Sequence, residues 1–166
     1  ILMAKDEINP KIQTIVNYCD FSWRWDYNNF KLFVKDNNCD GVVISYKDFH
    51  PHLLRPNLYA SMRVDNNGLM KEIREKFTFT KNKMNRYQSS GTYYFKDGEI
   101  LIHHCNELVD KRVTLNNEYY VSLVYNELLK SNLKVFVYEI PFFLQWGTPE
   151  DLEEYMHWSN YFNNEK

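Results

Sequence analysis

The sequence predicts a three-layer α/β fold built on one mostly parallel sheet. Short apolar segments typical of strands alternate with longer segments of helical periodicity along most of the 166 residues. Several of the apolar segments are nearly continuous, as strands covered on both faces require. No internal repeat or Gly/Pro-rich linker divides the chain, so we expect a single domain over residues 1–166.

The composition excludes several classes of partner. Hydrophobic residues make up 44% of the chain, which is enough for a core, and the net charge of -2 provides no broad basic surface for nucleic acid or a membrane. The three cysteines, Cys19, Cys39 and Cys105, have spacings that fit neither a disulfide framework nor a zinc site. No apolar run approaches the ~20 residues of a membrane span. We therefore expect a cytoplasmic protein that binds neither nucleic acid nor membrane.

The first elements follow from periodicity and capping. Residues 1–8 (ILMAKDEI) resemble the end of an amphipathic helix with no capping residue before it, which predicts that the chain is part of a longer domain. A buried strand is predicted at 13–19. Asp26 is placed to cap a helix over 26–38, and a second buried strand follows at 40–46.

The later elements begin with a hairpin. Asp65-Asn66-Asn67-Gly68 lies between YASMRV and LMKEIREK and is a strong turn signal. After Gly147, Thr148 is a predicted N-cap and Pro149 the first residue of the last helix. The other predicted elements are strands at 87–95, 133–140 and 142–146 and helices at 98–112 and 118–131.

Polar residues lie at the ends of several predicted strands. Asp20 ends the first strand, Glu75 and Lys76 close the hairpin, and Gln145 and Trp146 precede Gly147. Because ligands of parallel sheets bind beyond the carboxyl ends of the strands, these residues are candidates for one cleft. Asp20 is suited to a hard divalent cation and Lys76 to a phosphate. Asp20 also fits a turn or a helix cap.

Aromatic residues and histidines leave alternatives open. Trp23, Trp25 and Tyr93 could line a sugar or base site, or belong to the core. The pair His103-His104 resembles metal ligands, but neighbours on a helix point in different directions, so surface or packing positions are favoured.

Five segments taken in order carry a resemblance to a known family: IVNYCDF, IREKF, SSGTYYF, NNEYYVSLVYN and FLQWGTPEDLEEY. They resemble the sugar-phosphate nucleotidyltransferases, whose glycosyltransferase-A-like fold is Rossmann-like. The likeness is greatest to the branch of capsule and surface-polysaccharide biosynthesis. These enzymes join a nucleoside triphosphate to a sugar phosphate or related phosphorylated acceptor and release pyrophosphate.

The resemblance implies roles for individual residues. Asp20 matches the strand-end aspartate that binds Mg²⁺, and Lys76 matches the lysine that contacts the sugar phosphate, so both are the predicted catalytic residues. Gln145 occupies the position of a second metal ligand, where the family commonly has Asp. The predicted substrate-binding residues are Glu75, Gly91, Tyr93, Glu118 and Trp23.

The family's glycine-rich triphosphate loop has no counterpart here, because the five glycines form no Gly-x-Gly. The chain thus resembles the C-terminal two-thirds of such an enzyme, and we expect it to be inactive alone and to form homo-oligomers. Two alternatives remain. One is a nucleotide-sugar-dependent glycosyltransferase of the same fold, although Tyr18 stands where an Asp-x-Asp motif would have its first acid. The other is a non-catalytic binding or assembly module.

Overall fold

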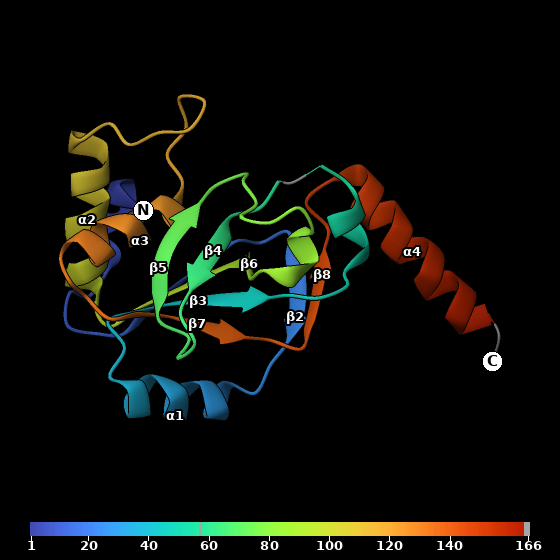
Figure 1. The fold of residues 1–166 in the computed structure, drawn as a ribbon, viewed down its shortest axis with the longest axis horizontal. Coiled ribbons are helices and arrows are strands. Elements are labelled where there is room, and N and C mark those ends of the chain that lie inside the picture. Colours follow the sequence, from blue (N-terminus) through green and yellow to red (C-terminus); the bar gives the residue numbers. More distant parts are fainter. Residues whose placement is uncertain (57, 165–166) are drawn as a thin grey trace.

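A computed structural model describes residues 1–56 and 58–164 of the chain (Figure 1). The strands are β1 Thr14–Asn17, β2 Phe21–Arg24, β3 Gly41–Tyr46, β4 Ser61–Val64, β5 Met70–Arg74, β6 Gln88–Phe95, β7 Val135–Glu139 and β8 Phe142–Gln145. The α-helices are α1 Tyr27–Asn37, α2 Gly98–Asp110, α3 Val121–Lys130 and α4 Pro149–Asn164. Short 3-10 helices are η1 Leu2–Glu7, η2 Pro51–Leu54 and η3 Lys83–Asn85. Within this described part, no helix combines the length and the apolar character needed to cross a bilayer.

The main sheet is mixed and mostly antiparallel, so the prediction of a mostly parallel sheet was wrong. Its order is β5-β4-β6-β3-β7, and β1 pairs with β6 beside this path. Only β3 and β7 form a parallel pair among the described strands. The physical reason is the position of β6. Strands β1, β3 and β7 do run in one direction, but β6 lies between β1 and β3 and runs against both.

The strand predicted at 13–19 is shorter and more exposed than expected. Strand β1 is an edge strand whose residues alternate between half-buried and exposed, and Ile15 is 38% exposed. It pairs only with β6, from Thr14 opposite Phe95 to Asn17 opposite Thr92. Its apolar residues therefore reflect a half-covered edge rather than a strand buried on both faces.

A second, two-stranded sheet lies outside the main one. Strands β2 and β8 pair antiparallel, with Phe21 opposite Gln145 and Arg24 opposite Phe142. The strand at 142–146 was predicted, but its partner at 21–24 was not, because the aromatic run there also fitted a cleft lining. The pairing fixes the end of β8 next to the residues that follow β1.

Helices cover both faces of the main sheet. Alternate residues of β3 point to opposite faces: Val42 and Ile44 belong to one core cluster and Val43 to the other. The core that contains Val43, the first core, lies under α2 and α3. The core that contains Val42 and Ile44, the second core, lies under α1 and the β2–β8 sheet (Figure 1). The three-layer arrangement expected from the sequence is therefore present, although the strand directions differ.

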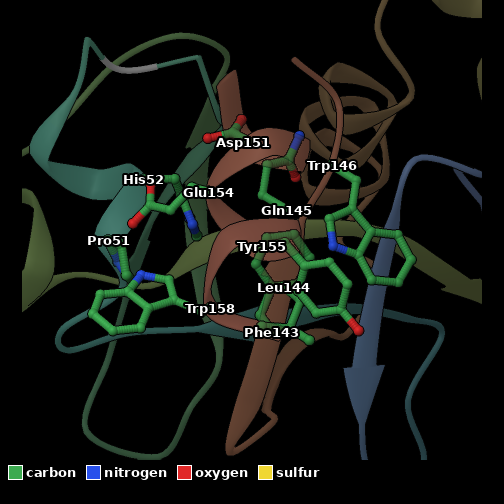
Figure 2. Close-up of a pocket in the computed structure, with 10 residues that line it drawn as sticks. All are labelled: Pro51, His52, Phe143, Leu144, Gln145, Trp146, Asp151, Glu154, Tyr155 and Trp158. Carbon is green, nitrogen blue, oxygen red and sulfur yellow. The ribbon is translucent and has the colours of Figure 1, made fainter. Parts of the chain in front are cut away.

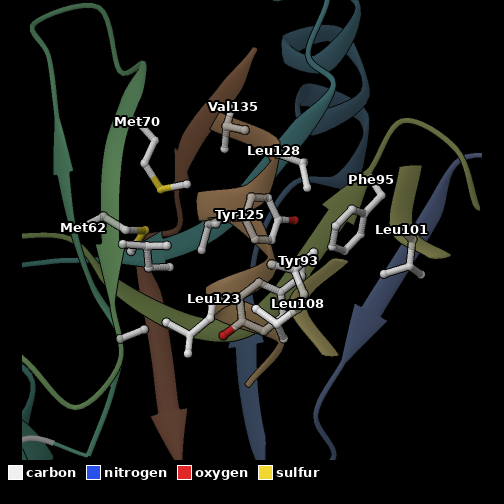
Figure 3. Packing of buried hydrophobic residues seen from close by; sticks show 14 of the residues in the cluster. Met62, Met70, Tyr93, Phe95, Leu101, Leu108, Leu123, Tyr125, Leu128 and Val135 are labelled. Atoms are coloured by element: carbon white, nitrogen blue, oxygen red, sulfur yellow. The ribbon is translucent and has the colours of Figure 1, made fainter. Parts of the chain in front are cut away.

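Tyr125 on α3 is the centre of the first core (Figure 3). Its ring is fully buried and lies 5.0 Å from that of Phe95 on β6. Its hydroxyl lies 2.7 Å from the carbonyl of Tyr94 and 3.1 Å from that of Val42. Helix α3 packs so tightly on β3 that a Cβ at Gly41 would lie 2.9 Å from the Tyr125 ring. One side chain thus joins α3 to both central strands.

The hairpin and the caps confirm the local predictions. Asp26 accepts hydrogen bonds from the backbone N–H groups of Asn28 and Asn29 at the start of α1. The Thr148 hydroxyl accepts one from the N–H of Asp151 in the first turn of α4. The tip of the β4–β5 hairpin crosses the sheet and reaches β7, where the Gly68 carbonyl accepts a hydrogen bond from the N–H of Val137.

Replacing Tyr125 with Phe should lower the free energy of unfolding by about 1–2 kcal/mol, because the buried hydroxyl and its two carbonyl partners lose their hydrogen bonding. Denaturant titration measures the change. Tyr119→Phe is the matched control, since Tyr119 is exposed and should change stability little. Equal loss in both variants would contradict the assigned role of the hydroxyl.

Candidate functional site

A cleft of about 220 Å³ opens where the residues after β1, β5 and β8 meet the first half of β6. It holds five of the residues singled out from the sequence: Asp20, Glu75, Gly91, Tyr93 and Gln145. Its other lining residues are Tyr18, Phe21, Leu58, Tyr59, Ala60, Ser89, Ser90, Tyr120, Gly147 and Thr148. Residues far apart in the sequence are thus brought together as the strand-end argument expected, even though the sheet is antiparallel.

Asp20 and Gln145 converge on Gly147. The backbone carbonyl of Asp20 accepts a hydrogen bond from the N–H of Trp146 at 2.9 Å, which fixes the two segments side by side. A Cβ at Gly147 would lie 2.6 Å from the Asp20 carboxylate and would also clash with the amide of Gln145. The bare glycine therefore leaves room for a carboxylate and an amide at one point of the cleft wall.

Gly91 forms part of an irregular stretch in β6. The pairing of β3 with β6 jumps from Ile44–Thr92 to Ser45–Ser89, so Ser90 and Gly91 bulge out of the ladder. Gly91 has a φ of +84°, and a Cβ there would lie 2.9 Å from the ring of Phe21. Backbone conformation and packing both require glycine at this position.

Glu75 lies in the cleft wall and accepts a hydrogen bond from the Ser122 hydroxyl at the start of α3. Burial raises the pKa of its carboxyl above the ordinary value, while Ser122 and Lys76 act in the opposite direction. Burial also raises the pKa of Tyr18 to about 12, with Glu75 as the next cause. Tyr93 is buried beneath, and its hydroxyl accepts a hydrogen bond from Ser89.

Lys76 and Glu118 do not line the cleft, but both contact Tyr120, which does, and we call their position the rim of the cleft. The Lys76 ammonium is 4.0 Å from the Glu118 carboxylate and 5.1 Å from the centre of the Tyr120 ring. The Tyr120 hydroxyl donates a hydrogen bond to Glu118. Tyr120 lines the cleft, so this ring connects the Lys76–Glu118 pair to its interior.

The charge of the cleft wall is negative. Asp20 and Glu75 contribute carboxyl groups, and no lysine or arginine is among the described residues that line the cavity. Asp20 contributes to raising the pKa of both Tyr18 and Tyr59, although burial is the largest cause for each. An anionic ligand would need a cation to enter this wall.

Trp23 lies outside the cleft. Its ring packs 4.9 Å from Phe21 and 6.1 Å from Trp25 in the second core, and it borders a different cavity. Trp25 is also a core residue. Conversely, sequence reasoning missed the cleft residues Tyr18 and Tyr120. Two signals in the sequence could have identified them. Tyr18 lies two residues before Asp20 and so points to the same side of an extended chain, and Tyr120 directly precedes helix α3.

A smaller apolar pocket of about 150 Å³ adjoins the cleft and shares Gln145 with it (Figure 2). Trp146 and Tyr155 form one wall, with ring centres 5.1 Å apart. Arg55, which follows η2, binds Asp151 and Glu154 at 2.6 and 2.9 Å and so fixes the start of α4. His52, on η2, has its Nε2 atom 2.9 Å from the Tyr46 hydroxyl, within hydrogen-bond distance.

The fold is similar to solved structures of sugar nucleotidyltransferases. A nucleoside-diphosphate-sugar pyrophosphorylase from Vibrio cholerae RC9 matches with a TM-score of 0.69 and 16% identity over 93% of this chain. A putative glucose-1-phosphate thymidylyltransferase from Bacillus anthracis, in complex with a sucrose, matches with a TM-score of 0.67 and 17% identity over 92% of this chain. The chain spans 60% and 56% of those two chains. No protein-family model and no curated protein matches the sequence.

Lowering the pH from 7 to 5 should reduce the stability of the protein by about 1–2 kcal/mol through His52. Burial, followed by nearby His50, lowers the pKa of His52 to about 3. In the unfolded chain the imidazole takes up its proton near pH 6.5. Unfolding therefore binds a proton between these two values, and the stability that is present above pH 6.5 is lost as the pH falls below it.

Thermal or denaturant unfolding at several pH values measures this slope. His52→Gln, which keeps an acceptor for Tyr46, should flatten it. His157→Gln is the control, because His157 is exposed on α4 and its replacement should leave the slope unchanged. An equal slope in His52→Gln and wild type would contradict the assignment.

Proposed function

We propose that this chain forms the acceptor-binding and metal-binding part of a sugar-phosphate nucleotidyltransferase. The reaction transfers a nucleotidyl group from a nucleoside triphosphate to a sugar phosphate or related phosphorylated acceptor. An acceptor phosphate oxygen bonds to the α-phosphorus while the bond to the β-phosphate breaks and pyrophosphate leaves. The resemblance of the sequence motifs supports a role in precursor synthesis for surface polysaccharide.

The charge distribution of the cleft carries the proposal. The wall presents the carboxyl groups of Asp20 and Glu75 and no cationic side chain among its described residues, while Lys76 lies at the rim. Such a wall repels a phosphate unless a cation accompanies it. A phosphate-bound metal ion at the wall and a lysine at the rim would together neutralise two phosphorylated substrates.

The residues at Gly147 fit a magnesium ion. The Asp20 carboxylate and the Gln145 side chain border the space that a Cβ at Gly147 would fill. Rotation of the Gln145 amide can exchange its oxygen and nitrogen, so that the oxygen faces this space. Mg²⁺ takes few protein ligands and keeps water and phosphate oxygens, so one carboxylate and one amide are compatible with it. When bound, Mg²⁺ would supply positive charge that neutralises the phosphates. Asp20 and Gln145 would hold it.

The acceptor side is assigned to the rim. Lys76 Nζ would bind the acceptor phosphate, and Glu118, already within reach of that ammonium, would accept hydrogen bonds from sugar hydroxyls. Glu75 offers further acceptor oxygens in the wall. The chemistry needs positioning and charge neutralisation rather than a covalent intermediate on the protein.

A pyrophosphate-release assay tests the function. It uses the complete product of the gene, of which these 166 residues are all or part, with Mg²⁺, the common nucleoside triphosphates and a panel of sugar 1-phosphates. Release that requires one triphosphate and one acceptor supports the proposal. No release with any pair, but turnover of a nucleotide sugar with an acceptor, would replace it with glycosyl transfer.

Asp20→Asn should abolish most Mg²⁺-dependent nucleotide binding and leave the fold intact, because the side chain is exposed and belongs to neither core. Gln145→Asp should strengthen metal binding, since a carboxylate suits Mg²⁺ better than an amide. Titration calorimetry with and without Mg²⁺ measures both effects. Asp36→Asn, an exposed change on α1, is the control. Wild-type affinity in Asp20→Asn would remove Asp20 from the metal site.

Lys76→Ala should weaken binding of the phosphorylated acceptor by roughly 1.5–3 kcal/mol, the scale of a hydrogen bond to a charged group, and affect the nucleotide much less. Glu118→Gln should alter the preference among sugars. Binding constants for acceptor and nucleotide are compared with those of Lys35→Ala, an exposed lysine on α1. Equal losses for both ligands would show that Lys76 does not select the acceptor.

A further inference from the structure

Three side chains on α2 converge at a point that the proposed function does not use. His103, His104 and Glu107 each place one ligand atom within 4.8 Å of those of the other two. The Glu107 carboxylate oxygen Oε2 is 3.8 Å from the Nε2 atom of each imidazole. The expectation that the two histidines point in different directions overlooked Glu107, which lies one turn along the helix between them.

The Oε2 atom of Glu107 is buried and has no hydrogen-bond partner among the described residues. Its other oxygen, Oε1, accepts a hydrogen bond from Lys111 at 2.8 Å, so the carboxylate is fixed in orientation with Oε2 directed at the imidazoles. The distance of 3.8 Å is too long for a hydrogen bond. A buried carboxylate oxygen without a partner is costly, and a cation between the three groups would remove that cost.

His104 is held in the orientation of a metal ligand. Its Nδ1 lies 2.8 Å from the carbonyl of Ile100, and because a carbonyl only accepts, Nδ1 carries the proton. Nε2 therefore carries a lone pair, which faces the Ser131 hydroxyl at 3.3 Å and Glu107 at 3.8 Å. A metal-ligating histidine typically donates its other N–H to a backbone carbonyl in this way.

We propose that His103, His104 and Glu107 bind a zinc ion through two imidazole nitrogens and one carboxylate oxygen, with water from solvent as the fourth ligand. Two atoms bound to one zinc at tetrahedral positions lie about 3.4 Å apart, so small side-chain rotations close the site. Two imidazoles favour zinc over magnesium or calcium. The His103 side chain is 65% exposed and provides the path of entry.

The site has charged and polar neighbours on α2 and α3. Lys111 binds Glu107 of the site and also the buried Glu127 of α3, which in turn binds Lys130. Ser131, at the end of α3, faces His104. The opposite end of α3 begins beside the cleft, ~15 Å away along the helix. The three protein ligands all lie on α2, and the site is independent of the proposed magnesium site.

Zinc titration of the whole chain tests the site. Calorimetry should show one Zn²⁺ per chain, and Zn²⁺ should raise the melting temperature. Co²⁺ bound in its place should give a visible spectrum of a nitrogen and oxygen site, without the charge-transfer band of a thiolate, which excludes capture by the exposed Cys19. A thiolate band would overturn the proposal.

Two variants and one control complete the test. His103→Ala, an exposed change, and Glu107→Gln should each weaken Zn²⁺ binding more than about 100-fold, because the loss of an outer partner of a ligand already costs about 10–100-fold. Their circular dichroism without metal should match that of wild type. His157→Ala removes an exposed histidine elsewhere and should leave Zn²⁺ affinity unchanged. Wild-type affinity in His103→Ala, or an equal loss in His157→Ala, would refute the site.

Discussion

The pairing of β6 is the constraint on which the rest of the structure depends. This strand pairs with β3 along one side and with both β1 and β4 along the other, so it must change partners halfway. The change is made at the bulge of Ser90 and Gly91, where the register to β3 also shifts. Because β1 leaves β6 at this point, the chain after β1 turns across the bulge and forms one wall of the cleft. The position of the cleft therefore follows from the pairing of β6 with three strands, β1, β3 and β4.

The local structure could be predicted from the sequence, and the pairing could not. Caps such as Asp26 and Thr148 act within one helical turn, and the Asp65–Gly68 turn acts within four residues, so short patterns contain them. The direction of β6 and its insertion between β1 and β3 depend on contacts between residues more than 40 positions apart, for example Tyr46 with Gln88 and Asn17 with Thr92. Apolar patterns identify strands without identifying their neighbours.

The same distinction holds for the candidate site. Asp20, Glu75, Gly91 and Gln145 were identified because each ends a strand or matches a family motif, and the structure places them around one cavity. Trp23 was misplaced because an alternating aromatic run fits a cleft wall and a buried strand equally well. Its side chain turns to the core through pairing with β8, about 120 residues later, which no local signal contains.

Several residues other than glycine adopt a left-handed backbone conformation, and one of them, Lys76, lies beside the cleft. Of the described non-glycine residues with positive φ, four are asparagines, which tolerate that conformation: Asn38, Asn116, Asn117 and Asn132. Lys76 and Arg112 have φ values of +50° and +52°, although their long side chains offer no such local compensation, and Lys76 directly follows the cleft residue Glu75. Contacts of the neighbouring residues stabilise the backbone conformation of Lys76. Ser122 donates a hydrogen bond to Glu75, and the Lys76 ammonium lies beside the Tyr120 ring and the Glu118 carboxylate. Such strain is concentrated at functional sites, because only an over-determined environment maintains it. The backbone strain at Lys76 therefore agrees with the proposal that its ammonium binds an acceptor phosphate.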